Sequence, residues 1–249
     1  MSYVKTKGIV VKQNDVGDSD RVLNILTENG IVNVWARGAR RPKSKLLASA
    51  QLFCLSDFVF YKSKSGYSIN SSEVSESFFN LRTDIERLTY ANYILELIND
   101  SIQEEQESSE VLKLLLNTLY YLCKPDRDPR LLTSIFELRL MCLIGFQPMI
   151  YECERCGREI LDYDSCIYYD KNNSSIICGE CINENEFFRK IPRGVYLSIL
   201  HICGAPNEKL FSFNASEEVI SGLRLFCREY VSNHMEKEYR SLDFLNKLL

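Results

Sequence analysis

A chain of 249 residues with 45% hydrophobic and 11% aromatic residues contains enough apolar side chains for a folded core, which excludes a disordered protein. No stretch approaches the ~20 apolar residues of a membrane-spanning helix. The net charge is −4, yet residues 1–80 carry 11 Lys and Arg against 7 Asp and Glu, while the remainder carries 19 against 27. This asymmetry indicates that the N-terminal part handles nucleic acid and that the rest serves other purposes.

The N-terminal part predicts five short β-strands. Apolar and β-branched residues alternate in segments separated by turn-forming residues, at 3–13, 21–27, 31–36, 52–61 and 67–74. Asn29-Gly30, between the second and third segments, is a strong hairpin signal. Five short strands in about 75 residues are typical of a small Greek-key barrel of the OB type. We therefore expect an α+β protein that begins with an OB-fold β-barrel over residues 1–77.

The segment between the third and fourth expected strands carries a dense positive charge. No Asp or Glu occurs between Asn29 and Ser56. The cations in this stretch are Arg37, Arg40, Arg41, Lys43 and Lys45. Because like charges this close repel each other, they indicate an anionic partner, and a nucleic-acid backbone is the obvious candidate. A solvated basic loop without a ligand is the alternative.

Aromatic residues near this loop are candidates for stacking on nucleic-acid bases. Trp35 directly precedes the cations, and the barrel segments also contain Phe58, Phe60, Tyr61 and Tyr67. Trp35 lies in an alternating strand, which favours a core position for its side chain. The other aromatic residues are likewise more often core residues than stacking platforms.

From about residue 78 the apolar residues recur with the period of helices. The expected helical segments are 88–102, 112–122, 129–144, 192–203, 216–235 and 242–249. Asp128 and Pro129 predict the start of the third helix, and Gly145 its end. We expect a helical domain formed by residues 78–149 and 186–249, with the apolar stripes packed in a bundle core.

Two CxxC pairs interrupt this domain. Cys153 and Cys156 form the first pair, and Cys178 and Cys181 form the second. Two such pairs at this separation can place four thiolates around a zinc ion, and four protein ligands leave no open position for catalysis. We therefore expect a structural zinc ribbon inserted at residues 150–185. Accidental pairs, or redox-active pairs, are the alternatives.

The remaining cysteines indicate a reducing environment. The chain has ten cysteines and no secretory signal, which favours thiols or metal ligands over disulfides and predicts a cytoplasmic protein. Six of them lie mostly in apolar strings and are expected to be small core residues: Cys54, Cys123, Cys142, Cys166, Cys203 and Cys227. Cys166 is close enough in sequence to compete for a ligand position, but it has no CxxC partner.

The sequence offers little for catalysis. It has two histidines, no glycine-rich phosphate loop and no nucleophile elbow. An acidic group could hold Mg²⁺ for nuclease chemistry, and its members are Asp15, Asp18 and Asp20. A turn with an ion pair to Arg21 is the favoured interpretation. We therefore expect that the protein is not an enzyme.

Several motifs taken in order resemble those of the bacterial RecO family of DNA repair proteins. They are GDSDRVL at 17–23, ARGARRPKSK at 36–45, YILEL at 93–97, FELRL at 136–140 and GFQP at 145–148, followed by the cysteine pairs. The similarity runs from the first strand to Cys181 and is weaker in the C-terminal helices. Family members usually have Glu at the position of Asp18, and residues 240–245 match the basic tail of the family poorly.

The resemblance implies an N-terminal OB fold, a helical domain and a zinc ribbon. It implies a recombination mediator that binds single- and double-stranded DNA, anneals complementary strands and acts with RecR, and in many bacteria with RecF. Together these proteins remodel single-strand-binding protein, whose acidic tail the helical part can hold, so that RecA loads on single strands. A different class, an RNA- or ribosome-associated adaptor with the same domains, is the alternative, since both ligands are polyphosphates.

Overall fold

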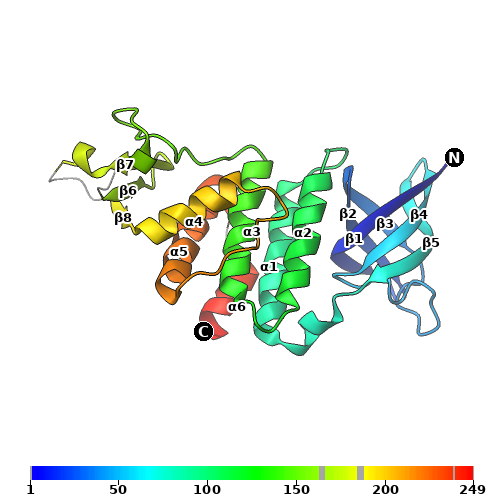
Figure 1. Cartoon of the computed structure of the whole chain (residues 1–249). Coiled ribbons are helices and arrows are strands. Elements are labelled where there is room, and N and C mark those ends of the chain that lie inside the picture. The colour runs from blue at the N-terminus through cyan, green and yellow to red at the C-terminus, as the bar shows by residue number, and fades with distance from the viewer. Residues whose placement is uncertain (1, 163–165, 184–187, 238, 249) are drawn as a thin grey trace. The chain divides into compact units, whose positions relative to one another are not determined.

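The computed structural model describes residues 2–162, 166–183, 188–237 and 239–248. The chain divides into two compact units. The first comprises Met1–Pro125 and Tyr239–Leu249, and the second comprises Asp126–Glu238. In the first unit a β-barrel is joined by three helices, and in the second unit three helices are joined by a small sheet (Figure 1).

The N-terminal strands form a closed barrel with the order β1-β2-β3-β5-β4. The strands are β1 Ser2–Val16, β2 Asp20–Thr27, β3 Gly30–Ala36, β4 Leu55–Ser63 and β5 Gly66–Glu76. Strand β1 is long enough to pair with β2 along its second half and with β4 along its first half, which closes the barrel. β3 and β5 pair in parallel, whereas the other pairs are antiparallel. The predicted OB-fold barrel is confirmed.

Alternating side chains of the strands fill the barrel. Leu23 and Ile25 of β2, Val34 of β3, and Phe58 and Phe60 of β4 are almost completely buried inside it. Period-two alternation puts one face of each strand inward and the other outward. The two phenylalanines therefore belong to the core and are not available for stacking on a ligand.

The hairpin between β2 and β3 differs slightly from the expected one. Its connecting residues are Glu28 and Asn29, while Gly30 already belongs to β3 and pairs with Thr27. Gly30 has a φ of 92°, and a Cβ atom there would overlap the carbonyl oxygen of Gln103. Glycine is required at this position because the backbone at Gln103, in the connection between two helices that follow the barrel, packs directly against β3.

The helices of the first unit are α1 Ile85–Ser101, α2 Ser109–Leu122 and α6 Arg240–Leu248. Asp84 begins α1 by accepting hydrogen bonds from two backbone amides of its first turn. The side chain of Asn99 in α1 donates a hydrogen bond of 3.0 Å to the carbonyl oxygen of Val11 in β1. α6 packs on α1, where the hydroxyl of Ser241 donates to Glu96 at 3.0 Å. Helix α1 thus connects the barrel and the C-terminal helix.

The helices of the second unit are α3 Pro129–Leu143, α4 Arg193–Gly204 and α5 Glu217–Met235, and each packs against the other two. Asp128 caps α3 by accepting hydrogen bonds from the amides of its first turn, with Pro129 directly after it. Gly145 follows the helix with a φ of 97°. The start and end predicted for this helix are confirmed.

A three-stranded sheet with the order β7-β6-β8 completes the second unit. Its strands are β6 Ile167–Asp170, β7 Ser175–Cys178 and β8 Arg189–Ile191. Strand β8 was not expected from the sequence. Because β8 pairs with β6, the sheet extends beyond residue 185.

The two contact units differ from the domain boundaries expected from the sequence. Helices α1 and α2 group with the barrel, because they carry contacts to β1 and β2. The boundary placed between residues 185 and 186 lies outside the described residues. That residues 1–77, the helical segments and the ribbon are separate domains stays a prediction. In the described part of the chain, no helix combines the length and apolarity needed to cross a membrane.

Candidate nucleic-acid interface and metal centre

Trp35 lies on the outer face of the barrel. Its side chain is 38% exposed, while its neighbours Val34 and Ala36 are buried inside. The expectation of a core position for Trp35 is wrong, because the two residues beside it occupy the inward positions of β3. An exposed indole at the end of a strand offers its ring to a ligand.

Asp20 holds this indole and the start of the basic loop. The indole Nε1 of Trp35 donates a hydrogen bond of 3.0 Å to the Asp20 carboxylate, and the amide of Gly38 donates one of 2.7 Å. The Gly38 amide, followed by the Trp35 indole, lowers the pKa of Asp20 below its usual value. The carboxylate is therefore charged at neutral pH and ties β2 to the residues that follow β3.

Arg40 is tied to the turn between β1 and β2. Its Nε lies 3.4 Å from a carboxylate oxygen of Asp15, and its Nη1 donates to the carbonyl oxygen of Gly17 at 3.0 Å. Arg21 forms the other ion pair of Asp15, at 2.9 Å, as expected from the sequence. The Arg21 side chain, through its hydrogen bond, is the main cause that lowers the pKa of Asp15. Asp15 thus fixes the basic loop through Arg40.

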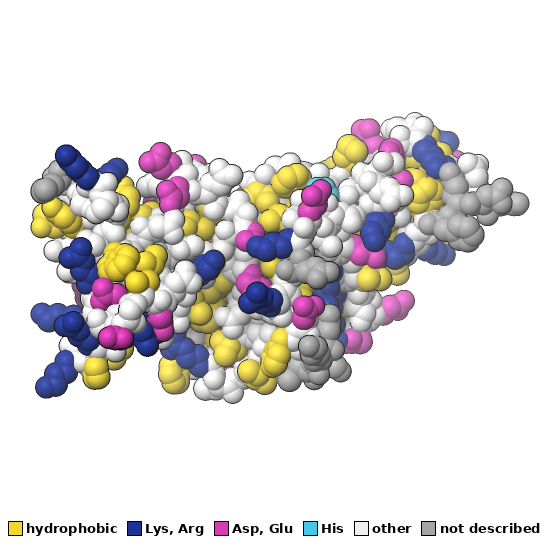
Figure 2. Space-filling model, turned by 180° about the vertical axis from the view of Figure 1, so that it is seen from behind, with side chains coloured by type: hydrophobic (Ala, Val, Ile, Leu, Met, Phe, Trp, Pro, Cys, Tyr) yellow, Lys and Arg dark blue, Asp and Glu magenta, His cyan; other side chains and the backbone are white. Residues whose placement is uncertain are grey.

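The other four cations of the loop are directed to solvent: Arg37, Arg41, Lys43 and Lys45. None of them forms an ion pair with a carboxylate among the described residues, whereas Arg40 does, and of the four the charge of Arg41 acts on Asp20. The loop itself is well packed, because Ala39 and Ala50 are fully buried beneath it. Figure 2 shows Lys and Arg side chains projecting from the barrel at its left edge, with fewer acidic ones among them. A compact loop therefore presents several unpaired positive charges.

The acidic residues at the turn between β1 and β2 help to hold the basic loop in place. Asp15 is engaged by two arginines and Asp20 by Trp35 and Gly38. Within the described ranges, no three carboxylates come together as a group that could hold a metal ion. The turn with an ion pair is the arrangement found, and the nuclease alternative has no support from its geometry. The sequence showed the acidic turn but not that it anchors the loop.

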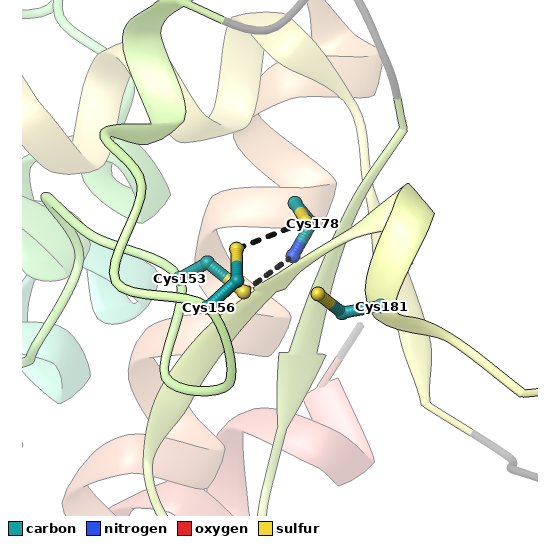
Figure 3. A group of neighbouring side chains, drawn as sticks. All are labelled: Cys153, Cys156, Cys178 and Cys181. Carbon is teal, nitrogen blue, oxygen red and sulfur yellow. Dashed lines mark hydrogen bonds between the residues drawn. The ribbon is translucent and has the colours of Figure 1, made fainter.

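The four cysteines of the two CxxC pairs come together at the sheet of the second unit (Figure 3). Cys153 and Cys156 lie in the loop before β6, Cys178 ends β7, and Cys181 follows it. Their sulfur atoms all lie within 4.8 Å of one another, and those of Cys156 and Cys178 are 3.9 Å apart. A tetrahedral zinc ion with Zn–S bonds of about 2.3 Å separates its sulfur ligands by roughly 3.8 Å. The quartet fits such an ion.

The pKa shifts of the four cysteines also favour the binding of a metal cation. Burial of the Cys153 thiol opposes ionisation, but backbone amides, first that of Cys178, stabilise the thiolate and lower its pKa to about 6. Hydrogen bonds shared with the thiols of Cys178 and Cys156 raise the pKa of Cys181 to about 12. Four thiolates this close repel each other, so full deprotonation of the group requires a bound cation.

Two glycines shape the loops that carry these ligands. Gly157 has a φ of 69°, and its amide donates a hydrogen bond of 2.8 Å to the carbonyl oxygen of Cys153. A Cβ atom at Gly179 would lie 3.1 Å from the carbonyl oxygen of Cys166. Arg155 joins the two loops by donating a hydrogen bond of 2.6 Å to the carbonyl oxygen of Cys181. Both glycines permit tight turns that larger residues would widen.

The six other cysteines are not part of the metal group. Cys54, Cys203 and Cys227 are buried, as expected for small core residues, whereas Cys123, Cys142 and Cys166 are only partly buried. Cys166 was a possible competitor for a ligand position, and its backbone instead packs against Gly179.

Comparison with known proteins assigns both parts of the chain. A family model described as Recombination protein O N terminal matches residues 1–78, and one described as Recombination protein O C terminal matches residues 82–243. The DNA repair protein RecO of Acetivibrio thermocellus is 39% identical over 249 residues, which cover 100% of this chain and 98% of that protein. The RecO proteins of Caldicellulosiruptor saccharolyticus and Clostridium acetobutylicum are 34% and 31% identical, over 98% and 99% of this chain and 98% of each relative.

Proposed function

Since this chain belongs to the RecO family of DNA repair proteins, we propose that it is a recombination mediator that binds single- and double-stranded DNA and anneals complementary strands. With RecR it promotes the loading of RecA on single strands coated with single-strand-binding protein, and RecF takes part where it is present. The acidic tail of single-strand-binding protein contacts the helical part. The protein works in the cytoplasm, at the nucleoid.

The exposed basic loop is the observation that carries this proposal. Arg37, Arg41, Lys43 and Lys45 are exposed, and none of them forms an ion pair with a carboxylate in the described part of the chain. Cations of this kind neutralise phosphates without reading sequence. Annealing of arbitrary strands requires that the protein hold backbones and leave base edges free to pair. A loop held rigidly by Asp15 and Asp20 binds phosphates with little loss of conformational entropy.

Zinc held by Cys153, Cys156, Cys178 and Cys181 stabilises the second unit. A site closed by four thiolates leaves no position for substrate, so the metal is structural. Binding of such an ion supplies about 10–16 kcal/mol in isolated zinc-finger peptides, enough to organise a short segment around it. We assign no catalytic residue and propose that the protein is not an enzyme.

Strand annealing in the presence of single-strand-binding protein, with and without RecR, tests this function. We expect the protein to accelerate annealing of complementary DNA strands and RecR to promote RecA loading. The double variant Lys43→Ala/Lys45→Ala should slow annealing, because both side chains are exposed and neither forms an ion pair with any residue that the structure describes. Lys113→Ala is the matched control, since Lys113 on α2 is exposed and paired with Glu110 at 2.7 Å.

An RNA- or ribosome-associated adaptor predicts a different result. Such a protein would not accelerate DNA annealing, and its affinity for RNA would exceed that for DNA of the same length. That outcome would overturn the proposal. Zinc content measured on the same variants should stay at one ion per chain, which separates loss of binding from loss of fold.

A further inference from the structure

Strand register places three aromatic residues in one row across the barrel. Trp35 of β3 lies opposite Ser68 of β5. Ser68 in turn lies opposite Tyr61 of β4, and Tyr61 lies opposite Tyr3 of β1. We call these four residues the aromatic row. Neighbours in register share one face of a sheet, so the row runs across four adjacent strands.

The aromatic row is on the outer face. Residues next to it in sequence, Val34 and Phe60, point into the barrel and are almost completely buried. Tyr3 is 64% exposed, and its ring centroid lies 5.6 Å from that of Tyr61 in a tilted arrangement. Two aromatic rings in contact on an outer strand face present a continuous flat surface on which a planar ligand can stack.

Ser68 is the small residue of the row. It stands between Trp35 and Tyr61 in the register, so no large side chain of the row separates these two aromatic residues. Adjacent strands lie about 4.8 Å apart, and three such steps give a row roughly 14 Å long. A flat base, whose two faces are both apolar, suits such a surface better than a globular partner does.

Cations flank both ends of the row. Arg37 opens the basic loop two residues after Trp35, and Lys5 lies two residues after Tyr3 on the same face of β1. Lys62 directly follows Tyr61 and therefore belongs to the opposite face of β4, where its Nζ lies 5.2 Å from the centre of the Tyr67 ring. Near the Trp35 end of the row, the carboxylate of Asp20 is already bound to the Trp35 indole.

We propose that unpaired bases of single-stranded DNA stack along the aromatic row while the loop cations hold the adjoining phosphates. This inference rests on the proposed function and adds a preference to it. In a duplex each base is paired and stacked, and its faces are hidden from protein side chains. The loop therefore serves both forms of DNA, whereas the row serves single strands alone.

Substitution of the two tyrosines tests the row. Tyr3→Leu and Tyr61→Leu should each weaken binding of oligo(dT) about fivefold or more, since stacking on an aromatic ring supplies that much per base. Duplex affinity should be unchanged, and Tyr61→Phe should restore single-strand binding because it keeps the ring. Tyr120→Leu is the control, as Tyr120 is 51% exposed on α2 and is not part of the aromatic row.

The fluorescence of Trp35 reports directly on binding at the row, because Trp35 is the single tryptophan of the chain. Oligo(dT) should quench its fluorescence, and duplex of equal length should quench it much less. The inference is overturned if both tyrosine variants bind oligo(dT) as the unchanged protein does, or if they lose duplex and single strand equally. It is also overturned if the variants lose oligo(U) but keep oligo(dT).

The lysine variants distinguish this failure from failure of the proposed function. Lys43→Ala/Lys45→Ala should weaken single strand and duplex together. If those variants behave as expected while the tyrosine variants have no effect, only the aromatic row is wrong. If the lysine variants leave both affinities unchanged, the loop is not the DNA site, and the row, which depends on it, is rejected with it.

Discussion

Asp20 and Trp35, which lie on neighbouring strands, are joined by a hydrogen bond of 3.0 Å from the indole Nε1 to the carboxylate. The same carboxylate accepts the Gly38 amide at 2.7 Å. One acidic side chain therefore sets both the orientation of the exposed ring and the path of the chain into the basic loop. This positioning role explains why a carboxylate lies beside the proposed nucleic-acid site.

Acid should weaken this link. The hydrogen bonds to Asp20 lower its pKa in the folded protein below the ordinary value of 3.8, so the unfolded state takes up its proton first as pH falls. The stabilisation is present above about pH 4 and is lost as pH falls through the lowered pKa. Between pH 5 and pH 3, the urea midpoint of Asp20→Asn should fall less than that of the unchanged protein. If the urea midpoints of the two proteins fell in parallel with pH, Asp20 would not contribute this stabilisation, because Asp15 is present in both proteins.

Salt should weaken DNA binding in proportion to the phosphates that the loop engages. Four exposed cations predict a slope of log affinity against log salt of roughly −2.8 for single strands, from about −0.7 per phosphate. Lys43→Ala or Lys45→Ala should each make the slope less negative by about 0.7, whereas Lys113→Ala should not change it. Fluorescence anisotropy over a salt series measures this. If the affinity for DNA did not change with salt concentration, the basic loop would be excluded as the DNA-binding site.

Removal of one thiolate should empty the metal site. Cys178→Ser should abolish bound zinc, measured by elemental analysis, and should expose the loops that carry the cysteines to proteolysis, because segments that bind structural zinc fold around the ion. Cys123→Ser, which changes a partly buried thiol of the first unit, is the control and should retain one zinc per chain. Duplex affinity should survive in both variants. A Cys178→Ser protein with full zinc content would exclude this ligand set.

Two glycines with positive φ should respond differently to alanine. Gly30 has a φ of 92°, and a Cβ there overlaps Gln103, whereas Gly17 has a φ of 55° with nothing within 4 Å of the added atom. Backbone strain costs of order 1–3 kcal/mol at either position, and Gly30→Ala adds the overlap. Urea unfolding followed by Trp35 fluorescence should show the larger loss for Gly30→Ala. Equal losses of stability in the two variants would mean that the connection between α1 and α2 moves away from the added Cβ atom at little cost.

Much of the fold could be predicted because its signals are local. Strand alternation, the Asp128 cap and the two CxxC pairs each depend on residues close together in the chain, and the structure agrees with them. Strand β8 was missed because a three-residue strand has no periodicity of its own and forms only by pairing with β6. The periodicity of each helix and strand also did not show which elements group into one compact unit, because that grouping depends on contacts between elements distant in sequence.

The candidate interface could be predicted only in part. The carboxylate-free stretch identified the cations, since charge is visible residue by residue. Alternation alone placed Trp35 in a strand but not on a face, and its assignment to the core was wrong because Val34 and Ala36 take the inward positions. The contacts of Arg40 with Asp15 and Gly17 join segments more than twenty residues apart, for which the sequence offers no rule.

By itself, the sequence determined which residues are charged, which segments are strands or helices, and which cysteines stand at metal-ligand spacing, because spacing and period are properties of the chain. Only the tertiary structure decided that Tyr3 lies beside Tyr61 and in the same row as Trp35. The closing of the barrel sets the register between strands that are distant in sequence, and that register determines which side chains share a surface.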